Sequence, residues 1–318
     1  MIFRNQHSVV LNRSILHLAA AFEMAKHIHG ASRMQHQQRN NLVPTFHVIA
    51  MVCDFFFPRL GGVEMHIWSL VQCLLQRGHK VIILTHAYGD RTGVRYMSCG
   101  LKVYYLPLVP MVDGTCFPTF GLAWFPLFRQ VCVREGVTLV HGHQATSCMS
   151  NEALLMASAL GLQTVYSDHS LFGFADLASV HINKVLRFTL SNVDACICVS
   201  HTCRENLCLR AGLPPSMVYA IPNAIDPARF TPPSLEARKQ AFDRSNGRVV
   251  VVVVSRLVHR KGTDLLARVV PRVCTEHPKV DFIIGGDGPK KPLLEAMLKQ
   301  HGLGGRVKLL GGVAHDQV

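Results

Sequence analysis

The sequence predicts an α/β protein built from two parallel sheets, each with helices on both faces. From residue 46 onward, short apolar runs alternate with stretches whose apolar residues recur at helical spacing. Strands and helices that alternate in this way form doubly wound parallel sheets. A segment with four prolines, residues 221–234, interrupts the alternation once, and the same pattern then starts again. A length of 318 residues agrees with about two domains.

These observations divide the chain into four segments. Residues 1–45 carry five Lys or Arg residues against Glu23 alone, and we expect a disordered basic extension. Residues 46–222 form the first Rossmann-like domain. Residues 223–247, with their prolines, are expected to be a linker. Residues 248–318 begin a second domain of the same type.

The elements of the first domain follow from its apolar runs. The run at residues 46–53 predicts a strand. Residues 62–77 predict a helix with one apolar face, and Gly78 ends it as a left-handed cap. Further strands are expected at residues 80–85, 101–106, 137–140, 164–167 and 194–199, with helical stretches between them.

The second domain repeats this order over fewer elements. Six consecutive valines at residues 249–254 predict a buried core strand. Two more strands are expected at residues 280–284 and 306–310, with helices at 264–274 and 292–301. Three strands are about half of the roughly 5–6 in a doubly wound sheet, so we expect this domain to be incomplete, with an unpaired edge and an exposed apolar face.

The composition excludes several classes of protein. Hydrophobic residues make up 49% of the chain, which is too apolar for a disordered protein. No apolar run reaches the ~18 residues of a membrane-spanning helix. The net charge is +13, but the basic residues are dispersed and not interleaved with aromatic residues, so nucleic-acid binding is not expected. The 11 cysteines lack zinc-site spacing and indicate a reducing compartment.

Gly61 and Gly62 lie between the first predicted strand and the first helix. Ligands of open α/β sheets bind beyond the carboxyl ends of the strands, which is where this turn lies. Two glycines allow the backbone to approach a ligand closely, and the N–H groups that begin the next helix suit a phosphate. A Gly-Gly pair by itself is more often an ordinary turn.

Arg256 and Lys261 follow the polyvaline strand and precede a helix. Two cations at a strand end suit an anion held between them, so we favour diphosphate binding over an ordinary solvated loop. Arg260, between them in the sequence, is interpreted as a solvated residue. The next strand-to-helix turn contains Gly286, Asp287 and Gly288, where glycines allow a base or a sugar to pack closely.

His169 lies at the end of a strand in the first domain. At this position the imidazole can hydrogen-bond a sugar hydroxyl or act in acid–base chemistry. His141 and His143 occupy a similar strand end and are weaker candidates. Phe172 and Phe174 follow and can line a sugar or lipid pocket, or can simply pack in the core.

Five motifs in this order together resemble the retaining glycosyltransferases of family 4, which have the GT-B fold of two Rossmann-like domains. Within that family the resemblance is to the catalytic subunits of phosphatidylinositol N-acetylglucosaminyltransferase, and it runs from about residue 46 to residue 318. The motifs are Phe57-Pro58-x-x-Gly61-Gly62-x-Glu64, the run from Asp168 to Phe174, the run from Ile221 to Pro227, Ser255-Arg256-Leu257 with Arg260-Lys261-Gly262, and the run from Ile284 to Pro289.

The resemblance implies transfer of N-acetylglucosamine from UDP-N-acetylglucosamine to phosphatidylinositol, the first step of glycosylphosphatidylinositol anchor synthesis. It implies no metal and no cofactor, other subunits of a membrane complex as partners, and a place on the cytosolic face of the endoplasmic reticulum membrane. The first domain lies on the acceptor side, and the second binds the nucleotide sugar. Arg256 and Lys261 then neutralise the leaving diphosphate, and His169 holds the donor sugar. Gly61, Gly62, Gly286, Asp287 and Gly288 also bind the donor, and Phe172 and Phe174 line the acceptor pocket.

The sequence departs from the family in two respects. It ends before the Glu-x7-Glu segment that holds the donor and has no C-terminal membrane span, which indicates a truncated chain and makes its activity doubtful. Two alternatives therefore remain open. One is a family 4 glycosyltransferase with a soluble acceptor, and the other is a non-catalytic subunit of the transferase complex.

Overall fold

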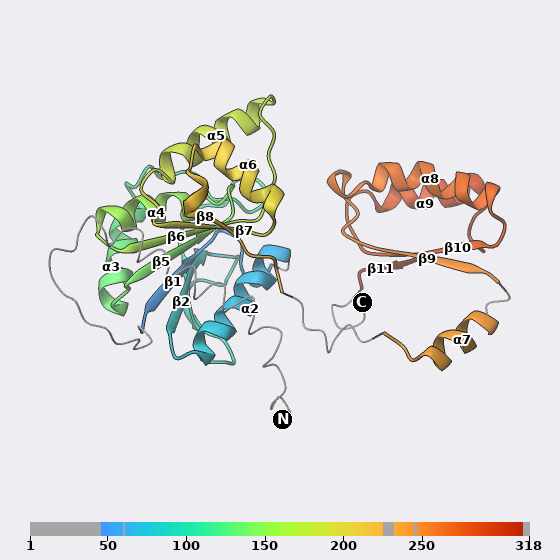
Figure 1. Cartoon of the computed structure of the whole chain (residues 1–318), viewed down its shortest axis with the longest axis horizontal. Coiled ribbons are helices and arrows are strands. Elements are labelled where there is room, and N and C mark those ends of the chain that lie inside the picture. The colour runs from blue at the N-terminus through green and yellow to red at the C-terminus, as the bar shows by residue number, and fades with distance from the viewer. Residues whose placement is uncertain (1–45, 60, 225–231, 245–246, 314–318) are drawn as a thin grey trace. The chain divides into compact units, whose positions relative to one another are not determined.

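The computed structural model describes residues 46–59, 61–224, 232–244 and 247–313 (Figure 1). The predicted basic extension, residues 1–45, lies outside the described residues. The chain divides into two compact units, Met1–Arg229 and Phe230–Val318. The predicted linker contains a helix, α7 (Leu235–Arg244), which belongs to the second unit.

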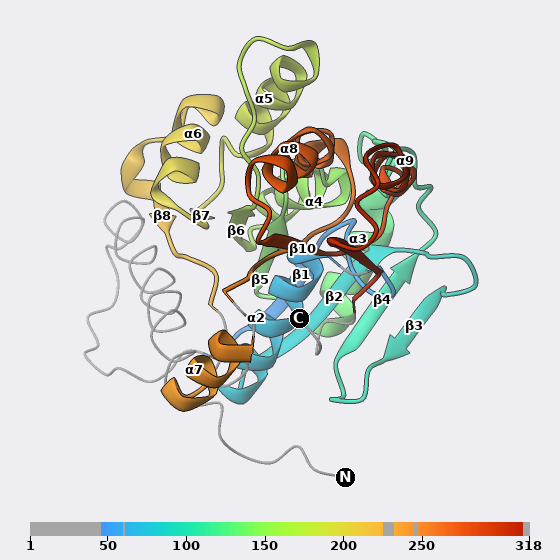
Figure 2. The same ribbon diagram turned by 90° about the vertical axis from the view of Figure 1, so that its right-hand side faces the viewer.

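The first unit contains an eight-stranded sheet in the order β3-β4-β2-β1-β5-β6-β7-β8. Every neighbouring pair is parallel except β3 and β4, so the predicted parallel α/β class is confirmed. Figure 2 shows β3 beside β4 at the outer edge. The strands are β1 (Val48–Val52), β2 (Lys80–His86), β3 (Gly93–Tyr96), β4 (Lys102–Leu106), β5 (Leu139–His143), β6 (Gln163–Asp168), β7 (Ala195–Cys198) and β8 (Val218–Ala220).

Side chains alternate between the two faces of this sheet, as a strand period of two requires. Ile49 and Met51 face one core, which α2 covers, whereas Ala50 and Val52 face a second core, which α3 and α4 cover. Figure 1 shows α2 on one side of the sheet and α4, α5 and α6 on the other. The helices are α2 (Gly62–Gln76), α3 (Trp124–Glu135), α4 (Cys148–Ala159), α5 (Leu177–Thr189) and α6 (His201–Ala211).

Two strands of this sheet were not predicted from the sequence. β3 is exposed along its whole length, and β8 has only three residues, so neither shows a buried apolar run. Because β1, β2, β4, β5 and β6 are parallel, their carboxyl ends lie at one edge of the sheet, which we call the carboxyl edge.

The second unit contains a three-stranded parallel sheet in the order β11-β10-β9, beside α8 and α9. The predicted strands are present, but the expectation that the polyvaline strand is buried is wrong. Val250, Val252 and Val254 are about half exposed, because within the described residues α8 and α9 pack on the other face. The elements are β9 (Val249–Val254), α8 (Thr263–Glu276), β10 (Val280–Gly285), α9 (Lys291–His301) and β11 (Val307–Gly311).

No helix in the described part of the chain is both long enough and apolar enough to cross a membrane.

Candidate functional site

The turn at Gly61 and Gly62 begins α2 at the carboxyl edge of the first unit. Gly61 is the N-cap, and no side chain caps the helix there. A Cβ at Gly61 would lie 2.5 Å from a carboxylate oxygen of Glu64, whereas a Cβ at Gly62 would meet no atom within 4 Å. The turn therefore leaves space in front of Gly62 for a ligand, and the buried carboxylate of Glu64 lies beside Gly61.

Three histidines meet at the same edge. His66 lies in the second turn of α2, His143 ends β5, and His169 follows β6. The ring centroids of His66 and His169 are 4.8 Å apart, and those of His143 and His169 are 5.5 Å apart. His169, which the sequence singled out, is thus positioned by two histidines from other elements. His66 was not predicted, and His143 was ranked as a weaker candidate.

Burial keeps these histidines neutral. Loss of solvation lowers the pKa of His169 to about 3 and that of His66 to about 4, although a hydrogen bond with the side chain of Asn223 raises the latter in part. The pKa of His143 also falls well below its ordinary value, mainly through burial. At neutral pH the cluster therefore presents imidazole lone pairs and N–H groups but no positive charge, which suits hydroxyl and amide groups better than phosphate.

The same three side chains are the one group in the described residues with the spacing of a metal site. One nitrogen from each lies within 4.8 Å of the others, and neutral imidazoles are good ligands for zinc. Two of these nitrogens, Nδ1 of His143 and Nε2 of His169, already lie at the hydrogen-bond distance of 3.2 Å. The geometry therefore fits a hydrogen-bonded pair of neutral rings, with the ring of His66 beside it, better than a preformed tetrahedral site.

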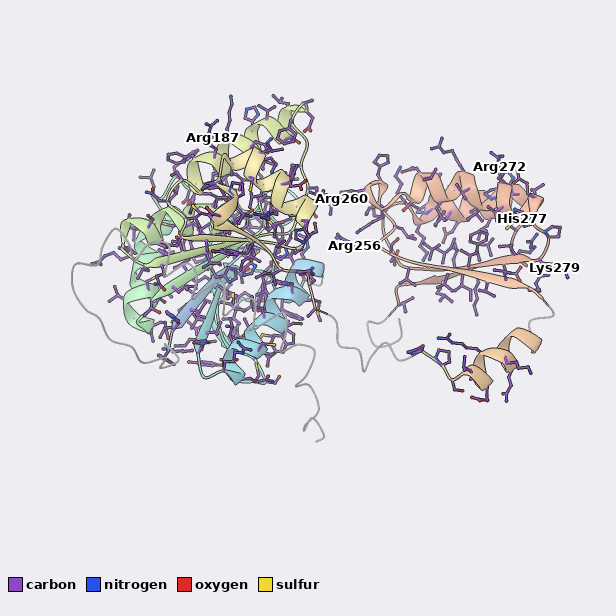
Figure 3. All side chains as sticks on the ribbon, in the orientation of Figure 1. Arg187, Arg256, Arg260, Arg272, His277 and Lys279 are labelled. Atoms are coloured by element: carbon purple, nitrogen blue, oxygen red, sulfur yellow. The ribbon has the colours of Figure 1, made fainter. Side chains whose placement is uncertain are left out.

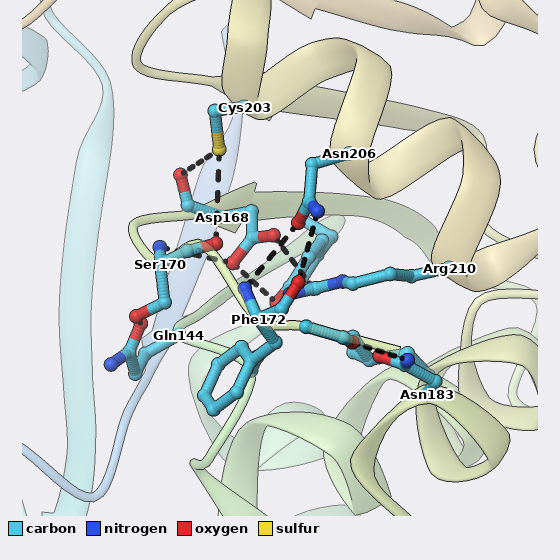
Figure 4. A network of polar contacts seen from close by, with 12 residues as sticks. Gln144, Asp168, Ser170, Phe172, Asn183, Cys203, Asn206 and Arg210 are labelled. Carbon is cyan, nitrogen blue, oxygen red and sulfur yellow. Dashed lines mark hydrogen bonds and ion pairs between the residues drawn. The ribbon is translucent and has the colours of Figure 1, made fainter. Parts of the chain in front are cut away.

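A buried ion pair supports the strand end that carries His169. A guanidinium nitrogen of Arg210, on α6, lies 2.9 Å from a carboxylate oxygen of Asp168, and neither side chain is exposed. Burial raises the pKa of Asp168 to about 6, although Arg210 and hydrogen bonds from Ser170, Tyr166 and His169 oppose this shift. The pair fixes the end of β6 to α6 and so holds the backbone that carries His169 (Figure 4).

Phe172 and Phe174 differ in their surroundings. The guanidinium of Arg210 lies 5.1 Å from the ring centre of Phe172, and Asn206 donates a hydrogen bond to the Phe172 carbonyl at 3.0 Å. Figure 4 shows these contacts around Phe172. Phe174 is 54% exposed. Phe174 is thus free to contact a ligand, while Phe172 is half-buried and braced by its neighbours.

In the second unit, Arg256 and Lys261 lie in the loop between β9 and α8. Both side chains are exposed, and no ion pair to either is found among the described residues. Figure 3 shows Arg256 and Arg260 extending from this loop, away from the three-stranded sheet. By contrast, the neighbouring Lys290 is paired with Asp264 at 2.8 Å. Arg256 and Lys261 are therefore available to an anion.

Gly286 and Gly288, in the turn between β10 and α9, have a structural role that the sequence did not reveal. A Cβ at Gly286 would lie 1.8 Å from the Ser255 carbonyl oxygen, and one at Gly288 would lie 2.6 Å from the Leu257 carbonyl oxygen. Both glycines adopt positive φ angles, 136° and 151°. They allow the Arg256 loop to pack directly on this turn, so they fix the position of that loop.

The structure thus groups the predicted residues within each unit. Gly61, Gly62 and His169 lie at the carboxyl edge of the first sheet, and Arg256 lies at the same end of the second sheet as Gly286. The contribution of Arg210 was not foreseen.

Comparison with known proteins identifies the relatives of this chain. Residues 236–318 match a family model described as "Glycosyl transferases group 1", and residues 86–176 match one described as "PIGA (GPI anchor biosynthesis)". Solved structures with the same fold include Anabaena HepE in complex with UDP, with a TM-score of 0.61, 17% identity, and coverage of 86% of this chain and 71% of that one. A Burkholderia vietnamiensis trehalose-phosphate synthase has a TM-score of 0.58 at 15% identity and covers 86% and 73%.

The two parallel α/β units and these comparisons define the class of protein as a glycosyltransferase with the GT-B fold. A phosphatidylinositol N-acetylglucosaminyltransferase subunit from Arabidopsis thaliana is 53% identical over 85% of this chain and 59% of its own length. The human subunit of the same name is 50% identical over 86% of this chain and 54% of its own length. The chain belongs to this family of phosphatidylinositol N-acetylglucosaminyltransferase subunits, and it spans little more than half the length of these relatives.

Proposed function

We propose that the chain takes part in the transfer of N-acetylglucosamine from UDP-N-acetylglucosamine to phosphatidylinositol with retention of configuration. The observation that carries this proposal is the identity of about half of the aligned residues with transferase subunits from a plant and from humans, across 85–86% of the chain. The alignment is long enough to include residues of both units. The reaction is the first step of glycosylphosphatidylinositol anchor synthesis.

The proposed donor contacts lie, within each unit taken separately, at the carboxyl end of its sheet. Arg256 and Lys261 neutralise the diphosphate, on which negative charge develops as the sugar leaves. The backbone N–H groups at Gly61 and Gly62 and the turn of Gly286, Asp287 and Gly288 complete the donor contacts. Support comes from the exposure of both cations, to which no ion pair is found in the part of the chain that the structure describes, and from the open space at Gly62.

His169 holds the donor sugar in this proposal. Its pKa of about 3 keeps the ring neutral at pH 7, so it acts through hydrogen bonds and not as a cation. Phe172 and Phe174 line the acceptor side, and the exposure of Phe174 supports this for one of the two.

No metal or cofactor takes part in the proposed reaction, because two cationic side chains supply the charge that a metal would supply. The proposed partners are the other subunits of a transferase complex, since the relatives are named as subunits, together with phosphatidylinositol. The proposed location is the cytosolic face of the endoplasmic reticulum membrane.

Donor binding tests the proposal directly. Titration calorimetry of the chain with UDP-N-acetylglucosamine, UDP-glucose and GDP-mannose should show the strongest binding for the first. Radiolabelled transfer to phosphatidylinositol by a version of the protein as long as its relatives, with free inositol as the comparison acceptor, should then yield a labelled lipid only. Equal binding of all three nucleotides would overturn the donor assignment, and transfer to free inositol would favour a soluble acceptor.

A further inference from the structure

Gln144, the residue after His143, adopts a backbone conformation that glutamine seldom has. Its φ angle is 73°, in the left-handed region, where few residues other than glycine are found. Both of its backbone groups are bonded. Its N–H donates to the Ser167 carbonyl at 3.0 Å, and its carbonyl accepts from the Ser147 N–H at 3.0 Å. The conformation is therefore fixed, and it sets the direction of the Gln144 side chain.

The side chain of Gln144 is bonded to the residue that follows His169. The Ser170 hydroxyl donates a hydrogen bond to the side-chain oxygen of Gln144, Oε1, at 2.9 Å (Figure 4). One residue earlier in each segment, Nδ1 of His143 lies 3.2 Å from Nε2 of His169. Two consecutive residues at the end of β5 thus contact two consecutive residues after β6, and the contact between Gln144 and Ser170 lies next to the histidine pair.

The amide nitrogen of Gln144 takes no part in this contact. A carboxamide has one oxygen, which accepts hydrogen bonds, and one NH2 group, which only donates them. Ser170 occupies the oxygen, and no hydrogen bond from the NH2 group to another residue is found in the part of the chain that the structure describes. Gln144 is half-buried, so its NH2 group is available to a ligand.

Folding alone gives little reason for a glutamine at this position. Glycine adopts the left-handed conformation without strain, and a neutral hydrogen bond such as the one from Ser170 contributes only modestly to stability. Residues held in rarely adopted backbone conformations are concentrated at functional sites. The conformation of Gln144, beside the histidine pair at the carboxyl edge, therefore indicates a contact with a ligand.

The polar groups that remain for a ligand at this place match an acetamido group. The pKa of His169, about 3, keeps its ring neutral at pH 7, and only one of its two ring nitrogens is in contact with His143. An acetamido group has one N–H donor and one carbonyl acceptor. The NH2 group of Gln144 is complementary to that carbonyl oxygen. Glucose has a hydroxyl in place of the acetamido group and therefore lacks the carbonyl.

We propose that Gln144 determines the specificity for the donor sugar. Its NH2 group donates a hydrogen bond to the acetamido carbonyl of UDP-N-acetylglucosamine, and Ser170 holds the carboxamide in the required orientation. The inference rests on the proposed function, because it places the sugar of the donor beside His169. It deepens that function by naming the residue that distinguishes N-acetylglucosamine from glucose. A site built to hydrogen-bond a polar group of the substrate discriminates against an analogue that lacks this group.

Titration calorimetry with UDP-N-acetylglucosamine and UDP-glucose tests this assignment. The quantity compared is the ratio of the two affinities. Gln144→Gly fits the left-handed conformation without strain and adds no charge, and it should lower the ratio about fivefold, which corresponds to one hydrogen bond of about 1 kcal/mol. Gln144→Glu keeps an oxygen for Ser170 but replaces the NH2 donor by an acceptor, and it should lower the ratio at least as much.

Gln163→Glu is the matched control, because it makes the same change at an exposed glutamine at the other end of β6 and should leave the ratio unaltered. An unaltered ratio in Gln144→Gly would overturn the inference. An equal loss of affinity for both sugars would also overturn it, since Gln144 would then only shape the site. Failure of the proposed function gives a different result, because the unaltered chain itself would then show no preference for UDP-N-acetylglucosamine, which would overturn both.

Discussion

Nδ1 of His143 lies 3.2 Å from Nε2 of His169, and the other ring nitrogen of His143 lies 3.3 Å from the sulfur of Met51. A thioether sulfur only accepts hydrogen bonds, so Nε2 of His143 carries the proton and Nδ1 accepts. Nε2 of His169 must then be the donor, which leaves a lone pair on its Nδ1. Met51 therefore sets the tautomer of the histidine that is proposed to hold the donor sugar.

Replacement of Met51 by leucine should remove the hydrogen bond that sets the tautomer of His143. Leucine has a similar volume but no acceptor, so the core stays filled while both tautomers of His143 become accessible. Long-range 15N–1H spectra of the histidine rings should show His169 change from one tautomer to a mixture. Affinity for UDP-N-acetylglucosamine should fall roughly fivefold, which corresponds to the loss of one hydrogen bond of about 1 kcal/mol. Met156→Leu, at another buried methionine, is the control. Unchanged ring spectra in Met51→Leu would contradict the assignment.

Removal of Arg210 should destabilise the first unit in a pH-dependent way. Arg210→Met leaves the Asp168 carboxylate buried without its partner, which costs about 3–5 kcal/mol at pH 7.5. The pKa of Asp168, about 6 in the folded chain, lies above its ordinary value of 3.8 and should rise further in the variant. The folded state then binds more protons than the unfolded state, so stability falls as pH rises through that window and recovers at pH 5.

Urea unfolding at pH 5 and at pH 7.5 measures this effect. Arg187→Met, at an exposed arginine on α5, should change the free energy of unfolding by less than about 0.5 kcal/mol at either pH. A loss in Arg210→Met that is the same at both pH values would show that Asp168 does not titrate in the folded chain.

The pKa of Glu135 predicts the opposite pH dependence. Burial alone would raise it, but hydrogen bonds from Lys102, Tyr104 and Lys80 lower it to about 2, against an ordinary value of 4.5. This carboxylate therefore contributes stability above pH 4.5, and the contribution is lost as pH falls toward 2. Glu135→Gln should cost about 2 kcal/mol at pH 7, after allowance for the partly exposed lysines.

Thermal unfolding monitored by circular dichroism between pH 2 and pH 7 measures the difference for Glu135→Gln. The curves of the variant and the unaltered chain should converge at the acid end. Glu205→Gln, at an exposed glutamate, should behave as the unaltered chain does at every pH. A constant difference down to pH 2 would contradict the lowered pKa.

Local patterns in the sequence predicted the strands and the position of His169, because strand periodicity and a strand end are properties of neighbouring residues. The partners of His169 could not be predicted in this way. His143 lies 26 residues from His169, and Arg210 lies 42 residues from Asp168, so only the sheet order brings them together.

Burial was also predicted less well than secondary structure. The valines of β9 form the strand that the sequence predicts, but their exposure depends on whether a second layer of helices packs on them. The sequence predicted a turn at Gly286. A glycine is needed there because the Ser255 carbonyl, 31 residues earlier in the chain, leaves no room for a side chain. Such contacts are set by tertiary packing, which no local pattern records.

Gly286→Ala should disrupt the Arg256 loop. The new Cβ would lie 1.8 Å from the Ser255 carbonyl oxygen at a φ of 136°, so both the space and the backbone conformation oppose it. We expect a loss on the order of 2–4 kcal/mol in the second unit, measured by urea unfolding. Gly305→Ala, where a Cβ meets nothing within 4 Å, should be neutral. Equal stability of the two variants would show that the loop can shift away from the turn.

Substitution of Arg256 and of Arg260 should distinguish a specific role in diphosphate binding from a general effect of positive charge. Both are exposed residues of one loop, and Figure 3 shows both extending from it. Arg256 lies two residues beyond the end of β9, where the charge of a leaving diphosphate would develop, whereas Arg260 lies six residues beyond it. In a version of the protein as long as its relatives, Arg256→Ala should lower kcat by about 10²–10³ because one charged donor to the transition state is lost. Arg260→Ala should change kcat less than about threefold, since salt screens a solvated charge that does not contact the diphosphate. Steady-state transfer to phosphatidylinositol measures both, and equal effects of the two substitutions would remove Arg256 from the mechanism.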